Sequence, residues 1–258
     1  MSKTAATRPG PLERARERLI FPLDVPTATE AKELIEMLSG EVGIFKVGKQ
    51  LFLHAGPDIV RHLRERGQQV FLDLKFHDIP RTVARASLEA TRLGVKMFTV
   101  HASGSFEMMR MTAAQVRQTC RRENLERPTI LAVTVLTSLS GEDLKMVGVR
   151  SGVLSQVTRL AKLAREAGMN GVVASPLEVE EIRKACGRRL TIVTPGIRPL
   201  SSDVEDQKRV TTPGDAIRAG SDYLVVGSPI QNADDPAHAA REIVEEIADA
   251  MRRGRARR

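Results

Sequence analysis

Two oppositely charged side chains, Asp73 and Lys75, lie inside the apolar segment VFLDLKFHD at residues 70–78. The first residues of this segment have the composition of a buried strand. Side chains alternate between the two faces of a strand, so Asp73 and Lys75 are expected on the same face. Burying an unpaired charge is unfavourable by several kcal/mol. A fixed carboxylate and ammonium here therefore indicate a site for chemistry, with an exposed ion pair at a strand end as the alternative.

Short apolar segments alternate with segments of helical periodicity about eight times and would position these charges. The predicted strands are 19–23, 43–47, 70–74, 97–100, 130–136, 171–174, 191–194 and 223–226. Predicted helices include 27–38, with Thr27 as a candidate cap, and 235–251. Eight strand–helix units predict an α/β fold with one domain, a closed (β/α)8 TIM barrel. A doubly wound open sheet is the alternative, but neither GxGxxG nor a P-loop follows any predicted strand.

The basic excess of the chain lies at its two ends. Of the formal net charge of +8, residues 1–18 supply five Lys and Arg against two Glu, and residues 252–258 supply five Arg and no acid. We therefore expect a basic N-terminal tail at 1–18, a barrel domain at 19–251 and an arginine-rich tail at 252–258. The barrel region is electrically balanced, and aromatic residues make up only 3% of the chain. Both features argue against a nucleic-acid partner.

Cysteine usage and hydropathy predict a cytoplasmic protein. Cys120 and Cys186 are far apart and lack metal-ligand spacing, as expected for two buried thiols. The sequence contains no secretory h-region and no apolar stretch long enough to span a bilayer, so no membrane partner is expected. Histidines and carboxylates show no convincing metal spacing, and His77 and His101 are interpreted as structural.

Polar residues follow the predicted strands at the end where TIM barrels hold their active sites. They are Asp24, Lys46, Asp73, Lys75, Asp78, His101, Thr137, Ser138, Gly196, Arg198, Gly227 and Ser228. The last four lie after strands seven and eight, where barrels frequently bind phosphate through backbone N–H groups. If only one of Gly196 and Gly227 were present, a tight turn would explain it as well as a phosphate site would.

Six motifs carry a resemblance to a known family. They are LD at 23–24, FKVG at 45–48, FLDLKFHDIPRT at 71–82, AVTVLTS at 132–138, VTPGIRP at 193–199 and DQ at 206–207. In this order they resemble the orotidine 5′-phosphate decarboxylases, and the likeness extends from Phe21 to the last predicted helix. The resemblance implies decarboxylation of orotidine 5′-monophosphate (OMP) to UMP on a TIM barrel, with no metal and no organic cofactor.

The resemblance also implies roles for individual residues. Lys75 would protonate C6 of the pyrimidine within a charged array that includes Lys46, Asp73 and Asp78. The active unit would be a homodimer in which Asp78, Ile79 and Thr82 serve the neighbouring subunit's site. The other implied substrate-binding residues are Asp24 and Lys46 at the ribose, Thr137 and Ser138 at the pyrimidine, and Pro195, Arg198, Gln207, Gly227 and Ser228 around the phosphate.

One position departs from the family pattern. The family usually has Gly-Arg after strand eight, whereas this chain has Gly227-Ser228. A neutral hydroxyl in place of a forked cation predicts weaker phosphate binding with the decarboxylation chemistry retained. The polar segment 200–207 is a candidate lid, in which Gln207 would reach the phosphate on closure.

Two other functions remain open from the sequence. One is a lyase or aldolase acting on a sugar phosphate, similar to hexulose-phosphate synthases, which typically use Mg²⁺. The other is a barrel that binds a phosphate ligand without turnover. The AVTVLTS and TPGIRP segments favour the decarboxylase.

Overall fold

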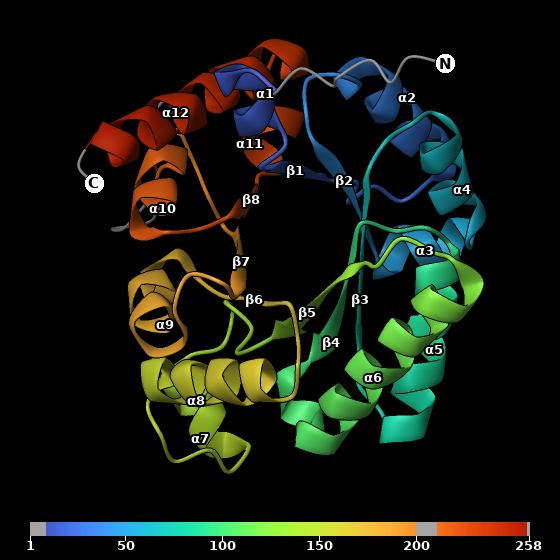
Figure 1. The fold of residues 1–258 in the computed structure, drawn as a ribbon. Coiled ribbons are helices and arrows are strands. Elements are labelled where there is room, and N and C mark those ends of the chain that lie inside the picture. Colours follow the sequence, from blue (N-terminus) through green and yellow to red (C-terminus); the bar gives the residue numbers. More distant parts are fainter. Residues whose placement is uncertain (1–8, 200–210, 257–258) are drawn as a thin grey trace, which may run out of the picture.

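The computed structural model describes residues 9–199 and 211–256, in which eight parallel strands close into a barrel in sequence order (Figure 1). The strands are β1 (Leu19–Pro22), β2 (Ile44–Gly48), β3 (Val70–Phe76), β4 (Met97–His101), β5 (Thr129–Val133), β6 (Gly171–Val173), β7 (Thr191–Pro195) and β8 (Tyr223–Val225). Pairing of β1 with both β2 and β8 closes the sheet. The predicted TIM barrel is confirmed, and the open sheet is excluded.

Helices surround the barrel and connect its strands (Figure 1). They are α1 (Pro11–Arg16), α2 (Ala28–Leu38), α3 (Lys49–Ala55), α4 (Asp58–Glu65), α5 (Pro80–Arg92), α6 (Phe106–Glu123), α7 (Gly141–Met146), α8 (Val153–Glu166), α9 (Val179–Cys186), α10 (Pro213–Ala219), α11 (Ser228–Gln231) and α12 (Pro236–Ala256). The predicted cap of α2 is confirmed, since the Thr27 hydroxyl accepts a hydrogen bond from the Glu30 N–H at 3.2 Å.

The barrel interior contains an apolar layer beneath a polar one. One core cluster fills the centre of the barrel with Ile20, Ile44, Phe71, Met97, Leu131, Val193 and Val225. Two residues further along β2, β3 and β4, on the same face of each strand, are Lys46, Asp73 and Thr99. The apolar layer therefore supports the polar side chains from below. A larger core cluster packs the outer faces of the strands against the helices.

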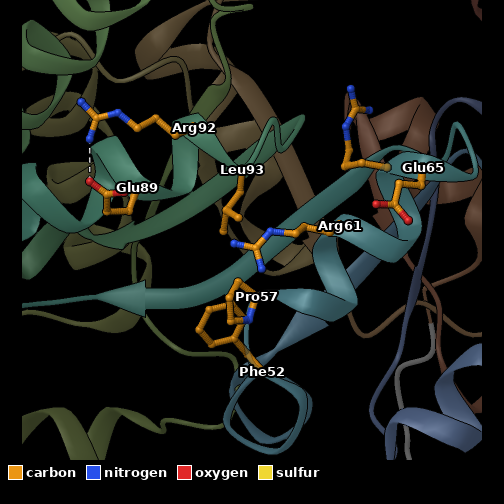
Figure 2. Close-up of a pocket in the computed structure, with 8 residues that line it drawn as sticks. Phe52, Pro57, Arg61, Glu65, Glu89, Arg92 and Leu93 are labelled. Carbon is orange, nitrogen blue, oxygen red and sulfur yellow. Dashed lines mark hydrogen bonds and ion pairs between the residues drawn. The ribbon is translucent and has the colours of Figure 1, made fainter.

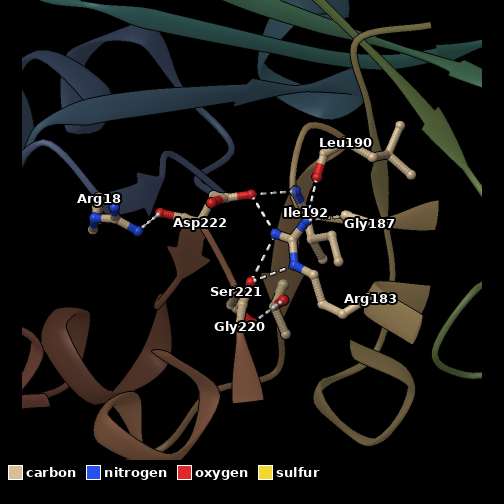
Figure 3. Close-up of polar contacts among 9 residues, drawn as sticks. Arg18, Arg183, Gly187, Leu190, Ile192, Gly220, Ser221 and Asp222 are labelled. Atoms are coloured by element: carbon tan, nitrogen blue, oxygen red, sulfur yellow. Dashed lines mark hydrogen bonds and ion pairs between the residues drawn. The ribbon is translucent and has the colours of Figure 1, made fainter. Parts of the chain in front are cut away.

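The N-terminal end of the barrel is held by the guanidinium of Arg183 in α9 (Figure 3). It forms a 2.6 Å ion pair with Asp222 and donates to the carbonyls of Gly187, Leu190 and Gly220. Asp222 also accepts from the Ile192 N–H at 2.8 Å. This network joins the end of α9 to the beginnings of β7 and β8.

Most boundaries lie within two residues of those predicted, and three differ by more. The fifth strand ends at Val133 rather than at 136, because the apolar residues beyond it belong to a loop. Residues 11–16 form a helix that packs against α12 and buries Ala15, although their charges predicted a tail. Likewise, α12 continues to Ala256, beyond the expected boundary at 251. Their charges correctly predicted that these residues lie at the surface. Charge alone does not distinguish a tail from a surface helix, because a packed helix also exposes a charged face.

Both cysteines are unpaired and buried, as predicted, and burial raises the pKa of each thiol. Among residues 9–199 and 211–256, no helix is long and apolar enough to cross a membrane.

Candidate active site

A bulge at the end of β3 directs Lys75 toward Asp73. The pairing of β3 with β4 shifts register between Leu72 and Phe76, and Lys75 has a left-handed backbone with φ of 52°. A side chain disfavours this conformation by about 1 kcal/mol, so the surrounding structure must hold it. Simple alternation predicted that Asp73 and Lys75 share a face. The two side chains do meet, but through a bulge that the alternation rule does not contain.

Four charged side chains form an array of alternating sign across β1, β2 and β3. The Lys75 ammonium lies 2.7 Å from Asp73 Oδ2, and Lys46 Nζ lies 4.0 Å from the same oxygen. Lys46 also pairs with Asp24 Oδ1 at 2.8 Å. The Asp73 and Lys46 side chains are only 12% and 11% exposed, whereas Asp24 is 60% exposed at the rim. The array therefore runs from solvent into the barrel.

Gly48 allows the first pair of this array to form. A Cβ at position 48 would lie 3.2 Å from Asp24 Oδ1 and 3.3 Å from Lys46 Nζ. A side chain there would press on both charged groups, which would have to move by a few tenths of an ångström. The glycine of the FKVG motif thus leaves room for the ion pair.

Sequence reasoning missed Thr99. Its fully buried hydroxyl accepts a hydrogen bond from the Lys75 backbone N–H and donates one to Asp73 Oδ1, each at 2.9 Å. The period-two alternation of β4 could have identified it, because Thr99 lies between the inward positions Met97 and His101.

His77 and His101 stack beside the charged array, with ring centroids 5.2 Å apart. Burial, together with the nearby charges of His77, Lys49 and Lys75, lowers the pKa of His101 to about 4. His101 is therefore neutral near pH 7. The interpretation of these residues as structural stays a prediction.

The predicted interface residues do not join the array within one chain. Asp78 is exposed after β3, and its carboxylate accepts a hydrogen bond from the adjacent Ile79 N–H at 2.6 Å. Ile79 is 67% exposed, and Thr82 is exposed on α5. All three side chains are thus available to another molecule.

The other predicted substrate-binding residues follow strands at the same end of the barrel. Thr137 and Ser138 are exposed beyond β5, and Pro195 ends β7. Arg198 is exposed, and its backbone N–H donates to the Thr211 carbonyl at 3.3 Å. Gln207 and the predicted lid at 200–207 lie outside the described residues.

The loop after β8 is shaped by close contact with β1. A Cβ on Gly227 would lie 2.8 Å from Pro22 Cγ, so this backbone approach requires glycine. Ser228 follows as the exposed first residue of α11. Gly227 and Ser228 therefore provide backbone N–H groups and one hydroxyl at the mouth of the barrel. Neither residue provides a cationic side chain.

A separate pocket of about 560 Å³ lies in the outer layer of helices, between the α3–α4 region and α5 (Figure 2). Its lining includes Phe52, Arg61 and Leu93 and contains none of the predicted site residues. In the described part of the chain, no three His, Cys, Asp or Glu side chains cluster so as to hold a metal ion. The candidate site is therefore the array at the C-terminal end of the barrel.

Comparison with known proteins agrees with this geometry. The family model described as "Orotidine 5'-phosphate decarboxylase / HUMPS family" matches residues 17–243. Orotidine 5′-phosphate decarboxylase of Syntrophotalea carbinolica is 55% identical over 94% of this chain and all of its own length. The protein of the same name from Geobacter sulfurreducens is 54% identical over 91% of this chain and 98% of its own.

A solved structure leads to the same family. The crystal structure of orotidine 5′-phosphate decarboxylase from Lactobacillus acidophilus superposes with a TM-score of 0.80 at 35% identity, and the match covers 89% of this chain and 98% of the other. Fold, sequence and the charged array thus agree, and the chain belongs to the orotidine 5′-phosphate decarboxylase / HUMPS family.

Proposed function

We propose that this chain is a carboxy-lyase that converts OMP to UMP in pyrimidine biosynthesis. Family membership and the names of its relatives support this activity. The observation that carries the mechanism is the array of Asp24, Lys46, Asp73 and Lys75 at the barrel mouth. A cytoplasmic location fits the two unpaired cysteines.

The chemistry explains why an ammonium is needed. Loss of CO2 from C6 leaves an electron pair in the plane of the pyrimidine ring, where it cannot delocalise into the carbonyl π system. A fixed positive charge close to C6 in a site that excludes water stabilises this pair. Lys75 then donates a proton to C6, which completes UMP. In this proposal the protein needs neither a metal nor an organic cofactor.

Asp73 fixes the position of the Lys75 ammonium. The carboxylate lies 2.7 Å from the ammonium and has little exposure to solvent. Lys46 lies 4.0 Å from the same carboxylate oxygen and pairs with Asp24, which in this proposal contacts the ribose hydroxyls.

We further propose that two chains complete each site. Asp78 has no ion-pair partner among the described residues of its own chain, and the neighbouring Ile79 is largely exposed. Asp78, Ile79 and Thr82 would then enter the site of a second copy. Mixing Lys75→Ala subunits with Asp78→Asn subunits should restore activity that neither variant has alone. Failure of such mixed dimers to turn over OMP would contradict the shared site.

Ser228 is proposed to weaken phosphate binding. A serine hydroxyl offers one neutral hydrogen bond, whereas an arginine offers a bidentate, charge-assisted contact that is stronger by about 1.5 to 3 kcal/mol. Arg198, in the loop after β7, would supply a cation for the phosphate. Gln207 would add a hydrogen bond to the phosphate from the proposed lid. Ser228→Arg should lower the KM for OMP tenfold or more with little change in kcat. An unchanged KM would mean that another group already supplies the charge.

The decisive test follows OMP absorbance with purified protein in EDTA. Steady formation of UMP is expected. Activity that requires added Mg²⁺ and a sugar phosphate would instead favour a related lyase or aldolase. Tight OMP binding with no UMP would indicate a binding protein.

A further inference from the structure

The hydroxyl of Thr99 is shared between the backbone of Lys75 and the side chain of Asp73. Both hydrogen bonds are 2.9 Å long, and the residue has no exposed surface. A hydroxyl has one proton to donate, and an N–H group can only donate. The Thr99 oxygen therefore accepts from Lys75 N–H, and its proton points at Asp73 Oδ1.

These bonds close a ring that contains both charged groups. Asp73 uses Oδ1 for Thr99 and Oδ2 for the Lys75 ammonium. Lys75 is thus held at two points, through its backbone N–H by Thr99 and through its Nζ by Asp73. A single buried hydroxyl couples the direction of the ammonium to the orientation of the carboxylate.

The backbone N–H of Lys75 needs this hydrogen bond to Thr99. Its φ of 52° is the left-handed conformation, and the ladder between β3 and β4 is interrupted at this bulge. The N–H of a residue at a bulge loses its usual partner in the sheet. Thr99 supplies that partner from β4, the strand beside the bulge.

We propose that Thr99 is a positioning residue that sets the aim of Lys75 for protonation at C6. The inference rests on the proposed function for its kinetic consequence. Without the hydroxyl, Lys75 N–H and Asp73 Oδ1 each lose a partner in a buried place, and the bulge relaxes. Misplacement of a catalytic group by about 1 Å lowers turnover by about 100-fold.

The sharpest comparison is Thr99→Ser against Thr99→Ala, because these variants differ only in the hydroxyl. We expect kcat of Thr99→Ser to stay near that of the parent and kcat of Thr99→Ala to fall by about 10- to 100-fold. The KM for OMP should change little in both. Equal kcat values for the two variants, or a change confined to KM, would overturn the proposal.

A matched control removes a buried hydroxyl elsewhere in the barrel. Thr194 is fully buried in β7, and its hydroxyl bonds that of Ser221 at 2.7 Å. Thr194→Val should reduce thermal stability but leave kcat per folded molecule unchanged. A loss of kcat like that of Thr99→Ala would assign the effect to general packing and overturn the specific role.

Amide hydrogen exchange at Lys75 tests the hydrogen bond from its backbone N–H to Thr99 without any substrate. Exchange should be slow in the parent and in Thr99→Ser and clearly faster in Thr99→Ala. Equal protection of the Lys75 amide in the parent, Thr99→Ser and Thr99→Ala would contradict the proposed role of this hydrogen bond. A parent that shows this pattern but makes no UMP would refute the proposed function and leave the structural role of Thr99 standing.

Discussion

The two ends of the barrel each contain a largely buried ion pair, and the two pairs are built differently. At the N-terminal end, Arg183 donates to Asp222 and to three backbone carbonyls, so most of its N–H groups are used. At the C-terminal end, Asp73 is the hydrogen-bond partner of the Lys75 ammonium among the described residues. Two donor positions of Lys75 therefore have no partner within residues 9–199 and 211–256.

The backbones beneath these pairs differ as well. Arg183 lies within the regular helix α9, whereas Lys75 occupies a left-handed position in a bulge. The first pair ties helix α9 to the sheet, and the second holds an ammonium on an unfavourable backbone conformation. In the proposed function, stability and reactivity thus belong to opposite ends of the same strands.

The largest expected effect is on activity at the C-terminal end. Lys75→Ala should lower kcat by at least about 10³-fold, because it removes both the stabilising charge and the proton donor. The fold should persist. Lys75→Gly, which relieves the left-handed strain, should be equally inactive yet more stable than Lys75→Ala by about 1 kcal/mol. Chemical denaturation and OMP turnover measure the two effects, and parent-level activity in either variant would end the mechanism.

The next effect is on stability at the N-terminal end. Arg183→Ala should lower the free energy of unfolding by about 2 kcal/mol, because it leaves Asp222 and the partly buried carbonyls of Leu190 and Gly220 without their partner. Activity per folded molecule should be unchanged. Lys184→Ala is the matched control, since Lys184 is exposed on the same helix and pairs weakly with Glu181 at 3.5 Å. If the Arg183 variant lost turnover without losing stability, the contrast between the ends would be wrong.

A smaller effect is expected on the pH dependence of stability, through His101 beside the charged array. The pKa of His101 is about 4 in the folded protein and near 6.5 when exposed. Between these values the unfolded chain binds more protons, so stability falls as the pH falls from 6.5 to 4. His101→Gln should flatten this dependence. Denaturation at several pH values measures it, with the exposed His238→Gln as control, and an unchanged slope would show that other groups dominate.

The barrel could be predicted from the sequence because alternation of strands and helices is a local signal that repeats along the chain. The residues at the strand ends followed from the same rule, and Asp24, Lys46, Asp73 and Lys75 do meet. The bulge at Lys75 could not be predicted, because it depends on pairing with β4. Alternation along β4 places Thr99 on the inward face, but it does not show that its hydroxyl joins Lys75 and Asp73, because that role depends on neighbours in space.

Helix α1 packs against α12, and β1 pairs with β8 where the barrel closes. Arg16 ends α1 just before β1 begins, so that end of α1 lies opposite the charged array. After β8, α12 runs back toward the same side and ends at Ala256. Attachment to a support through an exposed residue near the end of α12, such as Arg253, would therefore leave the mouth of the barrel facing outward.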